Sequence, residues 1–300
     1  MSTSSAHHSD GGSCAFIVLA HRNPDQVLRL IGRLGGAPIF LHVDVRARPT
    51  VYRRLAAEAE RYPTLRFLPR VHSGWGGWGI VEATLSGLRA AHLLDVSHAA
   101  VLTGQDYPLV PVSDVHDFSR RHQGQSFVAS WALPNPLWGP QGGMERIRYW
   151  HQSIYRRRFR VPIARSFPSG VRPFGSSAYC LLSRPAIGRL LDFLTRRPDV
   201  MRFYPHTWIP DEMLIATGLH NSSPSEELID ENLWFMDWPP GSGKHPRVLD
   251  SSDADALLAA AGRPGSAAGE ARAKLFARKF DAEVDAAIMD LLDRQAMQAH

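Results

Sequence analysis

Residues 14–44 read CAFIVLAHRNPDQVLRLIGRLGGAPIFLHVD, and this stretch decides the fold. It opens with a continuous apolar run over residues 14–20 and closes with a second one over residues 39–43. Residues 24–34, between the two runs, carry apolar side chains at helical spacing: Val27, Leu30, Ile31 and Leu34. The pattern predicts strand, helix, strand. Two strands joined through a helix are expected to pair in parallel with a right-handed crossover.

The alternation of strands and helices continues along the chain. We expect further helices over residues 50–62, 80–94, 184–195, 210–219, 252–261 and 281–299, and further strands over residues 65–68, 99–102, 178–182 and 233–235. The sequence therefore predicts one α/β domain over residues 14–300, behind a disordered tail over residues 1–13. Its sheet should be doubly wound and mostly parallel, with helices on both faces. Ligands bind such sheets at the carboxyl ends of the strands.

Two segments interrupt the pattern. Residues 131–175 mix proline, glycine, aromatic side chains and arginine, and this stretch is longer than an ordinary loop. Such length favours a functional or mobile segment over a plain connection. Residues 263–269 contain mostly glycine, alanine and serine and are expected to form a flexible insert.

Composition indicates a globular protein of 300 residues with a net charge of +5 and an isoelectric point near 9.5. The positive charge favours anionic partners such as nucleotide diphosphates, nucleic acid or an acidic membrane surface. Cys14 and Cys180 both lie in apolar runs, which suits buried reduced thiols. No signal peptide and no run of about 20 apolar residues is found. We expect a cytoplasmic protein and leave open a peripheral contact with the inner face of a membrane.

Six segments, taken in order, resemble one known family. They are His42-Val43-Asp44, Gly76-Gly77-Trp78, Leu102-Thr103-Gly104-Gln105-Asp106-Tyr107-Pro108-Leu109, Ser176-Ser177-Ala178-Tyr179, Ile209-Pro210-Asp211-Glu212 and Leu275-Phe276-Ala277-Arg278-Lys279-Phe280-Asp281. Together they resemble the core-2/I-branching β-1,6-N-acetylglucosaminyltransferase and peptide O-xylosyltransferase family, glycosyltransferase family 14. The resemblance runs from about residue 15 to about residue 292. It implies a GT-A-like fold. The animal members have disulfides and a membrane anchor, features that this sequence does not suggest.

The family resemblance implies an inverting transferase that moves N-acetylglucosamine or xylose from a UDP-sugar to an acceptor hydroxyl. Glu212 matches the family's general base, a carboxylate that takes the acceptor proton during attack on the sugar. The alternative is that Asp211 and Glu212 only favour the first turn of a helix through its dipole. The expected acceptor is a glycan, a glycolipid or a peptide.

Cations near the carboxyl terminus are expected to hold the diphosphate of the donor. Lys279 matches the family lysine that replaces a metal ion, and Arg278 adjoins it. A fixed ammonium or guanidinium can neutralise the charge that develops on departing UDP. Arg247 falls where branching enzymes carry a second diphosphate-binding arginine, with Lys244 as the substitute. The alternative reading of the Arg278-Lys279 pair is a solvated basic turn.

Further side chains are expected around the donor and acceptor. The resemblance makes Asp44 a uridine contact and Asp106 a donor-site residue, although both also suit plain turns at strand ends. Other sugar or acceptor contacts are expected from Ser177, Tyr179, Trp234 and Glu145. Trp234 and Trp238 are the better of the tryptophan candidates because indole faces stack on sugar rings, but a tryptophan is more often a core residue.

No metal or cofactor is expected. Asp44-Val45-Arg46 lacks the second aspartate of the usual Asp-x-Asp metal motif, and Asp253-Ala254-Asp255 reads as a helix cap after which a leucine pair follows. The histidines show no zinc-site spacing. A different class of function remains open, a non-catalytic basic α/β module that binds a glycan, nucleic acid or another anionic polymer; nucleic acid is not the expected partner.

Overall fold

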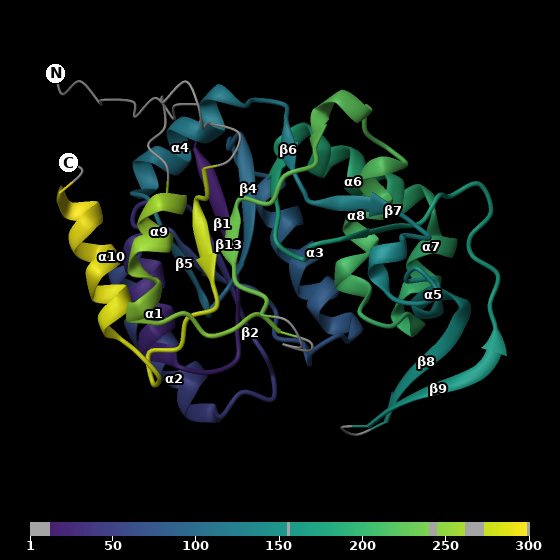
Figure 1. The fold of residues 1–300 in the computed structure, drawn as a ribbon, viewed down its shortest axis with the longest axis horizontal. Helices are drawn as coiled ribbons and strands as arrows, with labels where there is room; N and C mark the ends of the chain where they lie inside the picture. The colour runs from purple at the N-terminus through teal and green to yellow at the C-terminus, as the bar shows by residue number, and fades with distance from the viewer. Residues whose placement is uncertain (1–12, 155–156, 240–244, 262–272, 299–300) are drawn as a thin grey trace, which may run out of the picture.

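The computed structural model describes residues 13–154, 157–239, 245–261 and 273–298 (Figure 1). Three features predicted above lie outside these ranges: the tail over residues 1–13, apart from Ser13, then Lys244, and the insert over residues 263–269. In the described part of the chain, no helix is both long enough and apolar enough to cross a bilayer.

A seven-stranded sheet forms the centre of the molecule. Its order is β12 (Leu228–Ile229), β6 (Ser126–Phe127), β11 (Leu181–Ser183), β4 (His98–Thr103), β1 (Cys14–Ala20), β2 (Ile39–Val43) and β3 (Leu65–Phe67). β1 pairs in parallel with β2 and β4, and β2 pairs in parallel with β3. β11 is antiparallel to both of its neighbours. The predicted doubly wound, mostly parallel α/β sheet is therefore confirmed.

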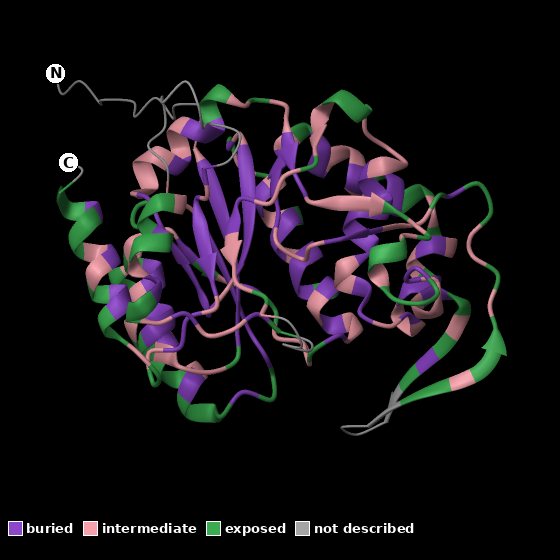
Figure 2. Cartoon of the chain, viewed as in Figure 1, coloured by how far each residue is buried: buried purple, intermediate pink, exposed green. Residues whose placement is uncertain are grey.

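Helices cover both faces of this sheet, and strand β1 shows why. Phe16 and Val18 belong to one hydrophobic core, whereas Ile17 and Leu19 belong to the other, because successive side chains of a strand point to opposite faces. The first core is closed by α1 (Pro24–Arg33), α2 (Pro49–Glu58), α4 (Val112–Arg121), α9 (Ala254–Ala260) and α10 (Ala287–Gln298). The second is closed by α3 (Trp78–His92), α6 (Arg184–Arg196), α7 (Pro198–Phe203) and α8 (Leu214–His220). Figure 2 accordingly shows the central strands β1 and β2 as buried.

Three smaller sheets complete the fold. They are β13 (Trp234–Met236), β14 (Phe276–Arg278) and β5 (Asp106–Pro108); β10 (Phe174–Ser176) and β7 (Ser130–Ala132); and β8 (Tyr149–Ile154) and β9 (Arg157–Ala164). The remaining elements are short helical turns: η1 (Ala59–Arg61), η2 (Pro136–Trp138), α5 (Glu145–Arg148), η3 (Tyr204–His206), η4 (Pro210–Glu212), η5 (Ser225–Glu227) and η6 (Ser251–Asp253). The β8–β9 hairpin extends away from the rest of the fold (Figure 1).

Three expectations from the sequence are corrected here. Residues 131–175, where the sequence pattern of strands and helices breaks down, contain the β8–β9 hairpin together with η2, α5 and parts of β7 and β10. The helix expected over residues 210–219 is a 3-10 turn, η4, followed by the short α8. The last helix begins at Ala287 rather than Asp281, and Asp285 Oδ1 accepts a hydrogen bond of 2.7 Å from the backbone N of Ala287 at its start. Asp281 lies before the helix and accepts hydrogen bonds of 2.7 and 2.8 Å from Arg22 and Asn23.

Candidate active site

A cavity of about 1020 Å³ opens at the carboxyl ends of β1, β2 and β4. Ala20, Asp44 and Thr103, at or just beyond these ends, all line it. The volume lies at the upper end of the range of about 300–1,000 Å³ that is usual for small-molecule sites. The cavity therefore has room for a large ligand or for two ligands together. Its place at the sheet edge is the one that the fold class predicts.

One wall of the cavity is cationic. Lys279 and Arg22 line it together with His21. Burial lowers the pKa of Lys279, and the neighbouring Arg22 and Arg278 lower it further, against an opposing effect of Asp281. Burial also lowers the pKa of His21, with Arg22 acting in the same direction and Asp44 opposing it. These cationic groups repel one another, so an anion bound among them would relieve that repulsion.

Arg278 is fixed beneath this wall by Asp106. The two residues are opposite each other in the antiparallel β14–β5 pair. Arg278 Nη1 donates to Asp106 Oδ1 at 2.8 Å and to Thr103 Oγ1 at 2.5 Å. Its guanidinium also lies 4.6 Å from the ring centre of Tyr179. Asp106 is fully buried and does not line the cavity, whereas Arg278 does. The position of Asp106 thus suits an indirect role, in which it holds Arg278, better than the expected direct contact with the donor.

Asp44 is held rigidly at the end of β2. Its Oδ2 accepts hydrogen bonds from the backbone N and the Oγ of Ser73, at 2.9 and 3.0 Å. Its Oδ1 accepts a hydrogen bond of 2.6 Å from the backbone N of Arg46. Although its residue surface is only 6% exposed, Asp44 lines the cavity. A carboxylate fixed in this way suits the recognition of ligand hydroxyl or N–H groups.

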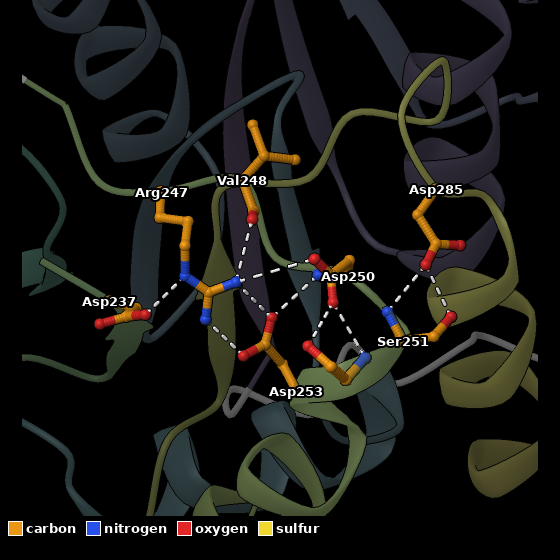
Figure 3. Close-up of polar contacts among 8 residues, drawn as sticks. Asp237, Arg247, Val248, Asp250, Ser251, Asp253 and Asp285 are labelled. Atoms are coloured by element: carbon orange, nitrogen blue, oxygen red, sulfur yellow. Dashed lines mark hydrogen bonds and ion pairs between the residues drawn. The ribbon is translucent and has the colours of Figure 1, made fainter. Parts of the chain in front are cut away.

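The guanidinium of Arg247 forms ion pairs with carboxylates of its own chain (Figure 3). It donates to Asp237 Oδ2 at 2.7 Å and to the two oxygens of Asp253 at 2.9 and 2.5 Å. Asp253 in turn forms a capping box with Asp250. The prediction that Asp253 belongs to a helix cap is therefore confirmed, but the helical segment begins at Ser251, one residue earlier than expected. Arg247 does not line the cavity. In this structure it stabilises the start of α9 and does not belong to the cationic wall.

Glu212 lines the same cavity as Lys279. It ends the 3-10 turn η4, which follows Ile209 in the left-handed region at φ 53° and ψ 61°. A β-branched residue rarely adopts this backbone conformation, and such strain is concentrated at functional sites. Because the segment is a 3-10 turn rather than the start of a longer α-helix, a simple helix-dipole preference explains Glu212 poorly.

Arg146 holds the carboxylate of Glu212. Its Nη1 donates to Glu212 Oε2 at 2.6 Å, and its side chain is 13% exposed. The guanidinium lies 3.7 Å from the ring centre of Trp138 and 5.7 Å from that of Trp208. All four side chains line the cavity. This end of the cavity therefore combines a positioned carboxylate with aromatic rings on which a sugar can stack.

The remaining predicted contacts divide into two groups. Ser177 and Tyr179 line the cavity, and Ser177 Oγ accepts a hydrogen bond of 3.2 Å from the backbone N of Tyr179. Trp234 is only 2% exposed, packs on Phe276 with ring centres 4.8 Å apart, and is a core residue. The prediction that Trp234 contacts a sugar is therefore corrected, because its ring is packed in the core. Trp238, which is 49% exposed, lines the cavity.

Glu145 lies on α5 beside Arg146 but does not line the cavity. Arg146, Arg22 and Trp208 also line the cavity and were not predicted from the sequence. Arg22 lies two residues after the first strand, so its position near a strand end could have indicated it. Arg146 carried no such signal, because only a tertiary contact brings it to Glu212. Trp208 lies four residues before Glu212, so its closeness to that segment could have indicated it.

Cysteines and metal-ligating groups complete the site description. Cys14 and Cys180 are buried free thiols, as predicted, and Cys180 is at the cavity wall. Within residues 13–154, 157–239, 245–261 and 273–298, no cluster of three or more His, Cys, Asp or Glu side chains is arranged to hold a metal ion.

Comparison with known proteins gives the class and then the family. The sequence model described as Core-2/I-Branching enzyme matches residues 15–256. Together with the α/β sheet and its cavity, this match indicates an α/β domain of the branching-enzyme class. The chain belongs to the Core-2/I-Branching enzyme family.

Curated relatives agree with this assignment. Xylosyltransferase 2 of Rattus norvegicus is 25% identical over 275 residues, which is 85% of this chain and 30% of the relative. Xylosyltransferase 1 of Homo sapiens is 25% identical over 296 residues, 93% of this chain and 30% of the relative. The chain thus spans about 30% of the length of these relatives. A solved structure was also compared, which is described as a putative glucose-1-phosphate thymidylyltransferase from Bacillus anthracis in complex with a sucrose. It is 12% identical, with a TM-score of 0.30, and the match covers 60% of this chain and 75% of that structure. This similarity is too weak to carry an argument.

Proposed function

We propose that this protein is an inverting, metal-independent glycosyltransferase with a GT-A-like fold, which transfers N-acetylglucosamine or xylose from a UDP-sugar to an acceptor hydroxyl. The observation that carries the proposal is that Glu212 and the cationic wall with Lys279 and Arg22 line one cavity. Arg278, beneath the wall, lines it too. Inverting transfer needs a base on one side of the reacting carbon and charge neutralisation on the other. Both kinds of group are present here.

In the proposed reaction, Glu212 removes the proton of the acceptor hydroxyl as its oxygen attacks C1 of the donor sugar. The bond between C1 and the β-phosphate oxygen breaks, and its electron pair leaves with UDP. Lys279 and Arg22 neutralise the charge that develops on the diphosphate, while Arg278 supports them from below. Asp44 is proposed to bind the nucleoside, and Ser177, Tyr179 and Trp238 to line the sugar site.

The test is UDP release from UDP-N-acetylglucosamine and UDP-xylose, with and without EDTA, by wild type and two variants. Glu212→Gln should lower turnover by about 10²–10⁴-fold, because it removes the general base, while UDP affinity stays near wild type. The matched control is Glu60→Gln, an exposed glutamate of η1. Near-normal turnover in Glu212→Gln would contradict the assignment of the base. Loss of UDP binding upon chelation would contradict metal independence. Donor binding with no turnover on a panel of acceptors would favour a module that only binds glycans.

A further inference from the structure

The β8–β9 hairpin is a two-stranded sheet that no other strand of the described chain extends. Its contacts with the rest of the fold run through α5 and η3 near its base. Figure 2 shows it as largely exposed. An isolated two-stranded hairpin is at best marginally stable in water, and a partner that covers one of its faces would stabilise it.

One face of the hairpin is apolar. Trp150 is directly opposite Val161, and Phe159 lies two residues before Val161 on the same face. Trp150, Phe159 and Ile163 are 39%, 48% and 67% exposed. Trp150 also stacks on His206, with ring centres 3.8 Å apart, which fixes the hairpin base to the body. Three large exposed apolar side chains on one small ribbon are unusual for a face left in water.

The same hairpin is strongly basic. Residues 149–164 contain four arginines and no aspartate or glutamate, and Arg148 and Arg165 adjoin the two ends of this segment, whereas the whole chain has a net charge of only +5. Arg148 and Arg160 are exposed and flank Tyr149, at 5.8 and 4.9 Å from its ring centre. The excess positive charge of the protein is therefore concentrated in the segment that also exposes the apolar face.

We propose that the β8–β9 hairpin binds the surface of an anionic phospholipid bilayer. Arginines are attracted to anionic headgroups, while aromatic and aliphatic side chains insert at the boundary between headgroups and acyl chains. Nucleic acid would also attract the arginines and stack on Trp150 and Phe159. It would gain little from an exposed aliphatic side chain such as Ile163, so the apolar face favours the bilayer.

The hairpin is joined directly to the cavity. Strand β8 follows α5 without a gap, and Arg146 of α5 holds Glu212 in the cavity. A bilayer bound to the hairpin would therefore lie near the Glu212 end of the cavity. Resting on the proposed function, this arrangement favours an acceptor carried by a lipid. Bilayer binding itself is measured without turnover, so it can fail or succeed independently of the transferase activity.

The experiment is co-sedimentation of the full chain with vesicles of phosphatidylcholine alone, or with about one third phosphatidylglycerol. Wild type should bind only the anionic vesicles, and binding should weaken as salt rises. Arg148→Gln with Arg160→Gln should lower the partition coefficient about 25-fold, since each arginine near the surface contributes about fivefold. Phe159→Ser with Ile163→Ser should lower it about tenfold or more.

Matched controls separate the hairpin from general charge and hydrophobicity. Arg48→Gln with Arg61→Gln removes two exposed arginines elsewhere, and Leu93→Ser with Met297→Ser removes two apolar side chains that are 83% and 77% exposed. Both controls should bind as wild type does. The proposal is overturned if hairpin variants with wild-type melting temperatures bind like wild type, if neutral and anionic vesicles bind equally, or if the hairpin binds a single-stranded oligonucleotide and no vesicle.

Discussion

Replacing Asp106 with asparagine should destabilise the fold through Arg278. The side chain of Asp106 is fully buried, and that of its partner Arg278 is 10% exposed. The replacement removes the charge that balances this guanidinium, but an amide oxygen can still accept the 2.6 Å hydrogen bond from the backbone N of Thr103. Removing one partner of a buried ion pair typically costs about 3–5 kcal/mol, because the other charge is left uncompensated.

This loss should be visible in thermal unfolding. In a chain of this size, about 1 kcal/mol corresponds to about 2 °C in Tm, so Asp106→Asn should lower Tm by about 6–10 °C. The assay is differential scanning calorimetry at neutral pH. The control is Asp290→Asn, which removes a half-exposed partner of Arg29 and should change the free energy of unfolding by about 0–1 kcal/mol.

A double variant tests whether the loss of stability comes from the unbalanced charge of Arg278. Asp106→Asn combined with Arg278→Met removes both charges, and replacing a buried pair by an apolar side chain is often neutral. The double variant should therefore regain most of the lost Tm while still binding UDP more weakly. A Tm for Asp106→Asn within about 2 °C of wild type would refute the view that this pair holds β14 in place.

Three further predictions concern the site and the core. Burial and the neighbouring Arg22 and Arg278 lower the pKa of Lys279, and a bound diphosphate should raise it, so UDP binding should take up a proton. UDP affinity should therefore fall as pH rises through the lowered pKa; calorimetry should show this loss weakened in Lys279→Arg, and the same slope in both proteins would contradict it. Arg146→Gln should lower kcat about 10–100-fold through misplacement of Glu212, with UDP affinity unchanged and partial recovery in Arg146→Lys; steady-state kinetics and UDP titration check it, and an unchanged kcat would exclude a positioning role. Gly87→Ala should cost about 1–3 kcal/mol in urea unfolding, because the added Cβ would meet Ile17 Cγ2 at 2.5 Å, and a Gly36→Ala control, where nothing lies within 4 Å, tests backbone strain at φ +80° instead. A Gly87→Ala protein as stable as wild type would mean that α3 can shift away from β1.

The sequence predicted the central fold well because its signals are local. The apolar runs at residues 14–20 and 39–43 became β1 and β2, and the helical spacing between them became α1. Both faces of a parallel sheet are buried, so its strands appear as continuous apolar runs. The β8–β9 hairpin gave no such signal, because its strands pack against no core and their arginines and aromatic residues alternate irregularly.

The site was predicted in part for a related reason. Strand ends and family motifs located Asp44, Glu212 and Lys279, all of which line one cavity. Side-chain contacts could not be predicted from the sequence. Arg146 reaches Glu212 across 66 residues. Arg247 is only six residues from Asp253, yet the sequence does not show that its guanidinium pairs with this carboxylate rather than with a ligand. Trp234 and Trp238 are four residues apart and equally aromatic, yet only packing against Phe276 makes Trp234 a core residue.

Strand β14 has a consequence for how the protein is made on the ribosome. Its parallel partner β13 and antiparallel partner β5 are both synthesised long before it, and Leu275 donates its backbone N–H to the carbonyl of Leu233. Lys279 follows β14 directly, so Arg278 and Lys279 can reach the cavity only after β5 and β13 have been synthesised. A nascent polypeptide can pair β1, β2 and β4 earlier, but its cavity gains these two cations only once β14 has emerged.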